Sequence, residues 1–133
     1  MTNPTADKTI TVYIAGPYTK GDTVVNIRNA LEAADEIIRR GYVPFIPHLN
    51  GFWHLVAPKS YSFWMGYDMV WLEKCDCVLR LPGESHGADM EVENAIDMGI
   101  PVFETMDVLD SYWQTRAREE AARWERRQAA ERN

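Results

Sequence analysis

Three acidic side chains stand close together where the sequence predicts that a strand gives way to a helix. Asp89, Glu91 and Glu93 follow an apolar run at 75–81 and a turn-forming segment at 82–87. A loop that enters a helix N-terminus exposes free backbone N–H groups and can hold an anion. The positive end of the helix dipole also favours an ionised carboxylate. Glu91 is therefore predicted to be an ionised acid, able to act as a nucleophile or general base.

The two flanking acids are expected to do something else. Asp89 and Glu93 lie two residues before and after Glu91, so they point about 200° around the helix from it. We expect them to be solvated or structural. Taken without any wider resemblance, Glu91 itself is better interpreted as an ordinary exposed helix acid.

Strands and helices alternate along the chain and must position these acids. Apolar and β-branched runs predict strands at 9–15, 42–46, 75–81 and 100–103. Apolar periodicity and capping signals predict helices at 23–40, 62–74, 87–98 and 107–132, with Ser62 capping the second, Gly41 ending the first and Gly99 ending the third. The aromatic-rich segment 48–61 is predicted to be an irregular lid or substrate loop.

This alternation predicts one α/β domain over residues 1–133, with a frayed N-terminus at 1–8. We expect three layers, in which helices flank a mainly parallel sheet of four to five strands in a flavodoxin- or Rossmann-like arrangement, followed by the long C-terminal helix. Such sheets bind ligands at the carboxyl ends of their strands. The loops at 16–22, 47–61 and 82–87 leave from those ends.

Two helix faces are predicted from the positions of apolar residues. In the first helix the expected buried face contains Ile27, Leu31, Ala34 and Ile38. In the last helix it contains Val108, Leu109, Tyr112, Trp113, Ala117 and Trp124, while the polar C-terminal end is expected to project into solvent or to pack on a second subunit.

Charge and composition exclude several classes of function. The net charge is −6, and residues 111–133 carry six Arg and four Glu, which leaves −8 on the first 110 residues. An acidic body is unsuited to binding nucleic acid polymers. There is no apolar run of membrane-spanning length and no apolar leader near the N-terminus, so a cytoplasmic protein without a membrane partner is expected. Cys75 and Cys77 are interpreted as free, buried thiols in a reducing compartment.

An ordered set of motifs resembles the nucleoside 2-deoxyribosyltransferases and the related nucleotide N-glycosidases. The first strand reads Val12-Tyr13-Ile14-Ala15-Gly16-Pro17-Tyr18. Further along come Asp68, Trp71-Leu72, Cys75-Asp76-Cys77-Val78, Ser85-x-Gly87-x-x-x-Glu91, Ala95 and Gly99-x-Pro101-Val102. The similarity spans about residues 10–104, and the whole chain is accordingly expected to be one nucleoside 2-deoxyribosyltransferase-like domain.

The resemblance implies cleavage of the bond between a sugar anomeric carbon and a nucleobase nitrogen. It places the nucleophile at Glu91, which forms a glycosyl–enzyme intermediate. It places at Asp68 an acid that protonates or orients the leaving base, and at Tyr13 a hydroxyl that holds the nucleophile. Neither a metal nor a cofactor is needed, and a homodimer or higher homo-oligomer is implied, with the aromatic region 52–72 and the last helix as candidate interfaces.

Ser85 discriminates between two activities within the resemblance. In this position, six residues before the nucleophile, a serine resembles the pattern of the nucleoside 5′-monophosphate hydrolases. An aspartate in the same position would resemble the pattern of the base-exchanging transferases. A serine at a helix N-terminus suits a phosphate dianion, and an aspartate would repel it. The first loop departs from the hydrolase pattern, because it has Thr19 and Lys20 where that pattern has Ser and Arg as hydrogen-bond donors. The favoured function is release of the base from a 2′-deoxynucleoside 5′-monophosphate; the alternatives are base exchange on a free deoxynucleoside and a non-catalytic nucleotide-binding module.

Each candidate residue also has a plainer structural interpretation. Asp68 can form a simple salt bridge, Tyr13 can be core, and the two glycines Gly16 and Gly87 can serve turns. His48 and His54 have no ligand partners at metal spacing, so His48 is expected to line the pocket or bond backbone, and Trp71 is expected in the core. The full set of candidate substrate-binding residues is Gly16, Pro17, Tyr18, Thr19, Lys20, His48, Trp53, Ser85, His86 and Gly87.

Overall fold

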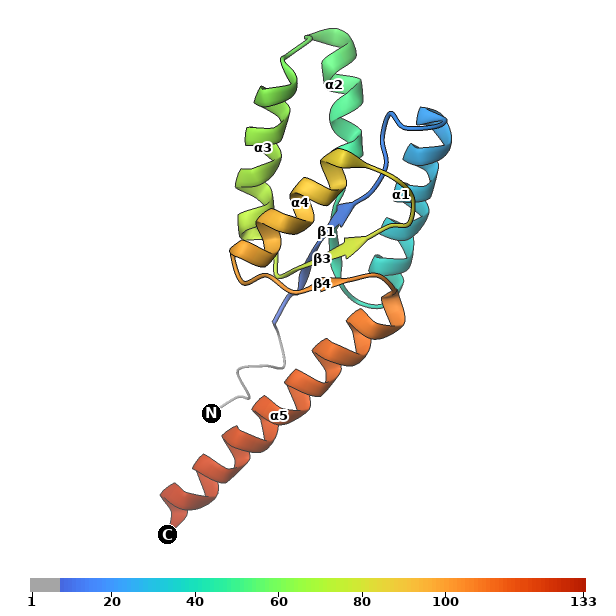
Figure 1. Ribbon diagram of the computed structural model, residues 1–133. Coiled ribbons are helices and arrows are strands. Elements are labelled where there is room, and N and C mark those ends of the chain that lie inside the picture. The colour runs from blue at the N-terminus through green and yellow to red at the C-terminus, as the bar shows by residue number, and fades with distance from the viewer. Residues whose placement is uncertain (1–7) are drawn as a thin grey trace.

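The computed structural model describes residues 8–133, so the predicted frayed segment 1–8 falls almost wholly outside the described residues. Strands and helices alternate along the described chain. In order they are β1 (Thr11–Ala15), α1 (Thr23–Arg39), β2 (Val43–Phe45), the 3₁₀ helix η1 (Pro47–Leu49), α2 (Asn50–Val56), α3 (Tyr61–Lys74), β3 (Cys77–Arg80), α4 (His86–Asp97), β4 (Val102–Phe103) and α5 (Met106–Arg132) (Figure 1).

The four strands form one parallel sheet in the order β2-β1-β3-β4. Tyr13 pairs with Val78 and Ala15 with Arg80, so β1 and β3 end side by side. The chain leaves β1 toward one edge for β2 and then crosses back to β3. This makes the β1–β3 boundary the topological switch point, where α/β sheets bind ligands. Pro44 is tolerated because β2 is an edge strand.

Alternate residues of β1 face two different cores. Val12 and Ile14 pack with Ala34 of α1 and Leu109 of α5 on one side of the sheet. Tyr13 and Ala15 belong to the second core, whose other buried members are Leu72, Val78, Ala88 and Ala95. Helices α3 and α4 therefore cover one face, and α1 with the start of α5 covers the other (Figure 1). The predicted three-layer α/β fold is confirmed.

The buried face of α1 differs from the prediction. Ala30, Ala34 and Ile37 are buried, whereas Leu31 and Ile38 are exposed. Only Ala34 of the predicted buried face is fully covered. The pattern favoured the largest apolar residues, but two alanines allow the helix to pack directly on the sheet. The helix ends as expected, with Arg40 as its C-cap and Gly41 next to it at φ 91°.

The predicted irregular segment 48–61 is mostly helical, which corrects the expected lid loop. It contains η1 and α2, and α3 then begins at Tyr61. The predicted cap of α3 was also wrong: Ser60 Oγ accepts from the Phe63 N–H at 3.1 Å, two residues before the expected Ser62. Leu49, Phe52, Trp53 and Val56 do have helical spacing, but Gly51 and the short length of the run favoured a loop, and no residue of α2 is buried.

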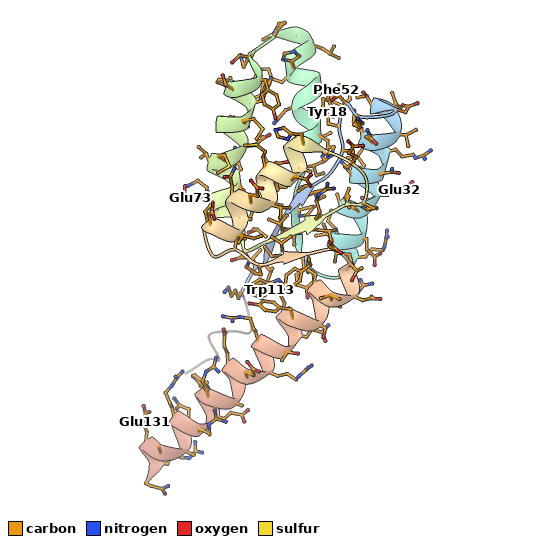
Figure 2. All side chains as sticks on the ribbon, viewed as in Figure 1. Tyr18, Glu32, Phe52, Glu73, Trp113 and Glu131 are labelled. Carbon is orange, nitrogen blue, oxygen red and sulfur yellow. The ribbon has the colours of Figure 1, made fainter. Side chains whose placement is uncertain are left out.

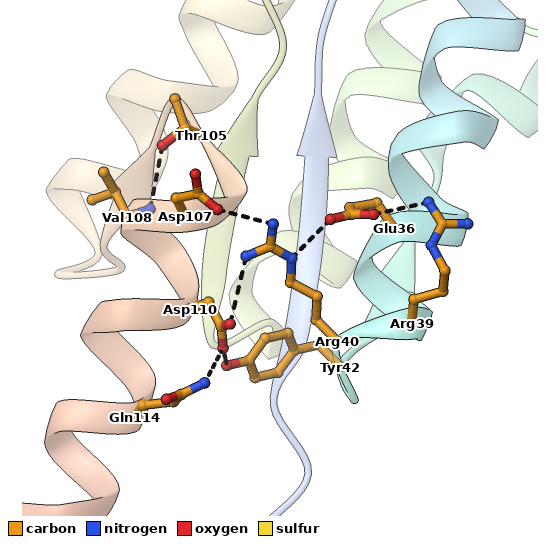
Figure 3. Close-up of polar contacts among 9 residues, drawn as sticks. All are labelled: Glu36, Arg39, Arg40, Tyr42, Thr105, Asp107, Val108, Asp110 and Gln114. Atoms are coloured by element: carbon orange, nitrogen blue, oxygen red, sulfur yellow. Dashed lines mark hydrogen bonds and ion pairs between the residues drawn. The ribbon is translucent and has the colours of Figure 1, made fainter.

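The start of α5 is fixed to the end of α1 by a polar cluster (Figure 3). Arg40 donates to Glu36 at 2.8 Å and to Asp107 at 2.9 Å, and Tyr42 donates to Asp110. Leu109 is buried there, but Val108, which was expected on the same buried side, is exposed. Beyond this anchor α5 runs away from the sheet (Figure 1), as expected for its polar end.

Both cysteines are free, in agreement with the sequence. Cys77 is buried in β3 and accepts from Trp113 Nε1 at 3.4 Å, and burial raises its pKa to about 12. Cys75 is half-buried at the end of α3 rather than inside the predicted strand. Within residues 8–133 the structure has no helix with the length and apolar character needed to cross a membrane.

Candidate active site

A cavity of about 830 Å³ opens at the carboxyl ends of β1 and β3. Its volume lies in the range of small-molecule sites. Its walls come from all three loops that the sequence singled out, from η1 and α2, and from α3 and α4. The lining residues are Gly16, Tyr18, Thr19, Lys20, Pro47, His48, Asn50, Gly51, His54, Lys59, Tyr61, Trp64, Met65, Asp68, Glu84, Ser85, His86, Gly87, Ala88 and Glu91.

Glu91 lies on the wall of this cavity and is only 8% exposed. The Tyr13 hydroxyl donates a hydrogen bond to Glu91 Oε2, because Tyr13 faces the side of the sheet that α4 covers. The plainer interpretation of Glu91 as an exposed helix acid is therefore wrong. Tyr13 is fully buried and does not line the cavity, and its hydroxyl contacts Glu91 from behind the cavity wall.

The expected ionisation of Glu91 at neutral pH is also wrong. Burial raises its pKa to about 8. Glu91 is the sixth residue of α4, so it lies in the second turn, where the helix dipole has lost much of its effect. Desolvation outweighs the dipole. The hydrogen bond from Tyr13 acts in the opposite direction, because it stabilises the ionised carboxylate.

Asp68 lines the same cavity from α3. Asn50 Nδ2 donates to its Oδ1 at 2.7 Å. Burial raises the pKa of Asp68 to about 6, and the hydrogen bond from Asn50 opposes that rise. The plainer expectation of a salt bridge is not met, because no cation within residues 8–133 pairs with Asp68.

The start of α4 forms a polar end of the cavity. Ser85 caps the helix, with its Oγ accepting from the Ala88 N–H at 3.1 Å, and the hydroxyl hydrogen stays available to a ligand. Arg80 fixes the preceding loop by donating to the Leu81 carbonyl, to the Gly83 carbonyl at 2.9 Å and to Asp89 at 3.0 Å. Asp89 therefore has the structural role that the sequence predicted.

The loop after β1 forms the adjoining part of the cavity wall. Asn26 of α1 donates to the carbonyls of Tyr18 at 3.0 Å and Lys20 at 2.8 Å, which fixes the loop's shape. Lys20 forms an exposed ion pair with Glu84 at 3.6 Å. The Tyr18 hydroxyl lies so close to Gly51 that a Cβ added there would be 1.9 Å from it.

The three histidines occupy different parts of the cavity wall. His48 is buried, its Nε2 donates to the Pro17 carbonyl at 3.1 Å, and burial lowers its pKa, so it both lines the pocket and bonds backbone as expected. His54 Nδ1 accepts from Trp64 Nε1 at 3.0 Å and from the Lys59 N–H at 3.1 Å. Within residues 8–133 no three His, Cys, Asp or Glu side chains gather as a metal site would require.

The structure brings most of the predicted site residues together. Two predicted substrate-binding residues do not line the cavity: Pro17 presents its carbonyl to His48, and Trp53 packs on Trp64 and Tyr67 instead. Trp71 is not core, because it is 40% exposed and stacks on Phe45. The remaining predicted residues line the cavity, with Tyr13 directly behind Glu91.

Sequence reasoning missed several residues of the cavity wall. Asn50 and Gly51 belong to a helix that had been interpreted as a loop, so their side-chain directions could not be assigned. The others lie in α3, in the connection before it, or beside residues that the sequence had predicted for the site. The missed residues are Pro47, Asn50, Gly51, His54, Lys59, Tyr61, Trp64, Met65, Glu84 and Ala88. Only the spacing of Tyr61, Trp64 and Asp68 at three and four residues could have indicated a shared helix face.

Comparison with protein families matches residues 10–105 to a domain of unknown function, DUF7768. The chain belongs to this family. No curated protein matches it in sequence. Among solved structures, the DUF7768 chain is similar to a 2-deoxyribosyltransferase from the psychrotolerant bacterium Bacillus psychrosaccharolyticus. The two are 18% identical, with a TM-score of 0.54 over 69% of each chain. At this identity the likeness shows a shared fold.

Proposed function

We propose that this protein cleaves the N-glycosidic bond of a 2′-deoxynucleoside 5′-monophosphate and releases the free base. The observation that carries the proposal is the buried Glu91 carboxyl, bonded to Tyr13 on the wall of a cavity that Asp68 also lines. Two carboxyl groups in one nucleotide-sized cavity are what glycoside cleavage requires. The fold shared with a 2-deoxyribosyltransferase adds support.

The proposed reaction has two balanced steps. In the first, an oxygen of ionised Glu91 bonds to the anomeric carbon while the bond from that carbon to the base nitrogen breaks. The electron pair of the broken bond stays on the base, which takes a proton from Asp68. In the second, water attacks the anomeric carbon, gives its proton to Asp68 and frees Glu91 from the sugar phosphate. Tyr13 stabilises Glu91 as an ion before and after the intermediate.

The start of α4 supports a phosphate on the substrate. Its free N–H groups, the Ser85 hydroxyl and the nearby Lys20 are suited to a dianion. Gly87 adds no side chain at this point, although the protein itself leaves room for one: a Cβ there would meet only the Tyr61 hydroxyl, at 3.7 Å. Glu84 acts against a dianion but is paired with Lys20.

Base release measured by chromatography tests the reaction. Glu91→Gln is expected to lower the rate by at least about a thousandfold, because an amide cannot form the glycosyl intermediate. Glu93→Gln is the matched control: it makes the same change two residues away on the same helix, at an exposed position. Equal activity of Glu91→Gln and wild type would refute Glu91 as the nucleophile.

Two substitutions of Ser85 test the phosphate preference. Ser85→Asp keeps a good helix cap but adds a negative charge, so we expect it to fold normally and lose its preference for monophosphates over nucleosides. Ser85→Ala should lose about 1 kcal/mol of stability with the cap and part of the preference. Wild-type rates that are equal for nucleosides and their monophosphates would contradict this assignment.

Two alternatives follow from the same geometry. A deoxyribosyltransferase would use the same Glu91 intermediate but resolve it with a second base; adding a free base and finding a new nucleoside would identify it. A non-catalytic nucleotide-binding module would bind monophosphates and release no base. The buried Glu91–Tyr13 pair disfavours that module, because a binder of an anion gains nothing from an acid beside the sugar.

A further inference from the structure

Asn50 meets Asp68 inside the cavity, although the two residues come from different helices. Asn50 is the first residue of α2, Asp68 lies in α3, and Nδ2 of Asn50 donates to Oδ1 of Asp68 at 2.7 Å. We propose that Asn50 is the positioning residue for Asp68, holding Oδ1 so that Oδ2 carries the proton to the leaving base. The catalytic part of this inference rests on the proposed function.

A neutral amide suits this task better than a cation. A Lys or Arg partner would hold Asp68 ionised, and an ionised carboxylate has no proton to give. The amide N–H occupies a lone pair of Oδ1, so the acid proton of Asp68 is left to Oδ2. Burial raises the pKa of Asp68 to about 6 despite the hydrogen bond from Asn50, so the protonated form stays accessible near neutral pH.

The backbone of Asn50 is itself held in place. Its N–H bonds to the carbonyls of Pro47 and His48 at the junction of η1 and α2. His48 is buried and donates from Nε2 to the Pro17 carbonyl, in the loop after β1. The Asn50 side chain therefore projects from a junction that is tied to the first strand's loop, and the orientation of Asp68 is fixed relative to the sheet.

Other titratable groups share the cavity with Asp68 and are present in every variant below. They are Glu91 and His86 of α4, His48 of η1, His54 of α2, Tyr61 of α3, and Lys59 before it, with Tyr18 and the Lys20–Glu84 pair on the facing loops. A change in the titration of Asp68 between variants at position 50 therefore reports the loss of the amide.

The test compares two nucleotides that differ in their need for an acid. An unmodified purine deoxynucleotide needs a proton on its leaving base, whereas an N7-methylated one carries a cationic base that leaves neutral. For Asn50→Ala we expect kcat on the unmodified nucleotide to fall by about tenfold to a hundredfold, and on the methylated one by less than about threefold. Asp68→Asn should show the same selectivity.

A carboxyl-carbon NMR titration provides a readout that does not depend on activity. Asn50 donates to Asp68 and favours its ionised form, so Asn50→Ala should raise the pKa of Asp68. If the alanine variant folds poorly, the nearly isosteric Asn50→Asp can replace it. In that variant the carboxylates at positions 50 and 68 would be adjacent, which should raise the pKa of one of them further. Asn94→Ala is the matched control, because Asn94 also contacts α3, through Met69 at 3.0 Å, but lies outside the cavity wall.

The outcomes separate the positioning role of Asn50 from the proposed reaction. Equal losses on both nucleotides, or an unchanged titration of Asp68 in Asn50→Ala, would overturn the positioning role. A wild-type protein that releases no base from either nucleotide, nor from the pyrimidine deoxynucleoside monophosphates, would refute the proposed reaction and the catalytic part of this inference with it. The titration would then still decide whether Asn50 controls the Asp68 carboxyl.

Discussion

The pKa values of Glu91 and Asp68 lie in an unusual order for their proposed roles. The nucleophile has the higher value, about 8, and the acid the lower, about 6. With the two values two units apart, only about one molecule in a hundred holds an ionised Glu91 and a protonated Asp68 at pH 7. The pH profile of kcat/KM should therefore be a low plateau between about 6 and 8, with falling rates on either side.

Tyr13→Phe tests which carboxyl controls which side of this profile. The phenol stabilises the ionised form of Glu91, so its removal should raise the pKa of Glu91. We expect the upper break to move to higher pH and the plateau to fall, as measured by initial rates of base release from pH 5 to 10. Movement of the lower break instead would show that Glu91 has the lower pKa of the two.

Stability should also depend on pH through Glu91. Between the ordinary value of 4.5 and the raised value of about 8, the folded protein holds a proton on Glu91 that the unfolded chain has released. The free energy of unfolding should therefore fall as pH rises through this window and level off above it. Because Asp68 also contributes below about 6, the clearest window is from 6 to 8.5.

Glu91→Gln should remove this dependence, because an amide does not ionise. From pH 6 to 8.5 we expect wild type to lose on the order of a few kcal/mol of stability relative to Glu91→Gln, as measured by urea denaturation. The free energy of unfolding of Glu93→Gln should depend on pH in the same way as that of wild type. A constant difference between Glu91→Gln and wild type across this range would mean that Glu91 has an ordinary pKa in the folded protein.

The sequence could place Glu91, Asp68 and Tyr13 together only through the resemblance. No periodicity relates a tyrosine in the first strand to a glutamate 78 residues later; the parallel register of β1 and β3 does. The ionisation of Glu91 was predicted from the helix dipole alone. Burial, which decides it, depends on packing that the sequence does not display.

At the scale of elements, strands were the most predictable and α2 the least. The β-branched run at 11–15 and the glycines at 41 and 99 fix their elements locally, and the structure confirms them. Helix α2 is only seven residues long, no side chain caps its first turn, and the apolar side chains that have helical spacing are not buried, so no local signal identifies it clearly. Its helix is defined by contacts with the rest of the protein, such as those of Asn50 with Asp68 and Gly51 with Tyr18.

Gly51→Ala tests the contact between α2 and the loop after β1. Alanine should favour the helix by about 1 kcal/mol, but its Cβ would displace the Tyr18 hydroxyl from the cavity wall. We expect unchanged or greater stability together with a rise in KM of about three- to tenfold, equivalent to about 1 kcal/mol of binding. Urea denaturation and initial rates measure the two effects.

Gly66→Ala in α3 is the matched control. A Cβ there meets nothing within 4 Å, so the variant should gain stability without any change in KM. If Gly51→Ala behaves in the same way, Tyr18 does not contribute to substrate binding.

The whole molecule has two surfaces of contrasting character. The C-terminal part of α5 is charged, exposed and far from the sheet; Figure 2 shows Glu131 at its end, while Trp113 lies where α5 still contacts the body. Helices α2 and α3 instead expose many large apolar side chains and few charges. The exposed ones are Phe52, Trp53, Leu55, Val56, Tyr61, Phe63, Val70 and Trp71.

An apolar surface of this extent is typical of protein interfaces. The region 52–72 was expected from the sequence to form the contact between subunits, and this stays a prediction. Isologous contacts place the same patch of both copies together, so one apolar residue on the patch affects the interface twice. Val56, 86% exposed at the end of α2, is the most accessible of these side chains.

We therefore expect wild type to be a homodimer or higher homo-oligomer and Val56→Glu to dissociate it, because the substitution would bury two unpaired carboxylates at the interface. Val24→Glu is the matched control: Val24 is 75% exposed, but in α1, on the other side of the sheet from α3. Light scattering coupled to size-exclusion chromatography gives the mass of each variant. A wild type that is monomeric at high concentration would contradict the predicted oligomer. A Val56→Glu variant with the wild-type mass would show that another surface forms the contact between subunits.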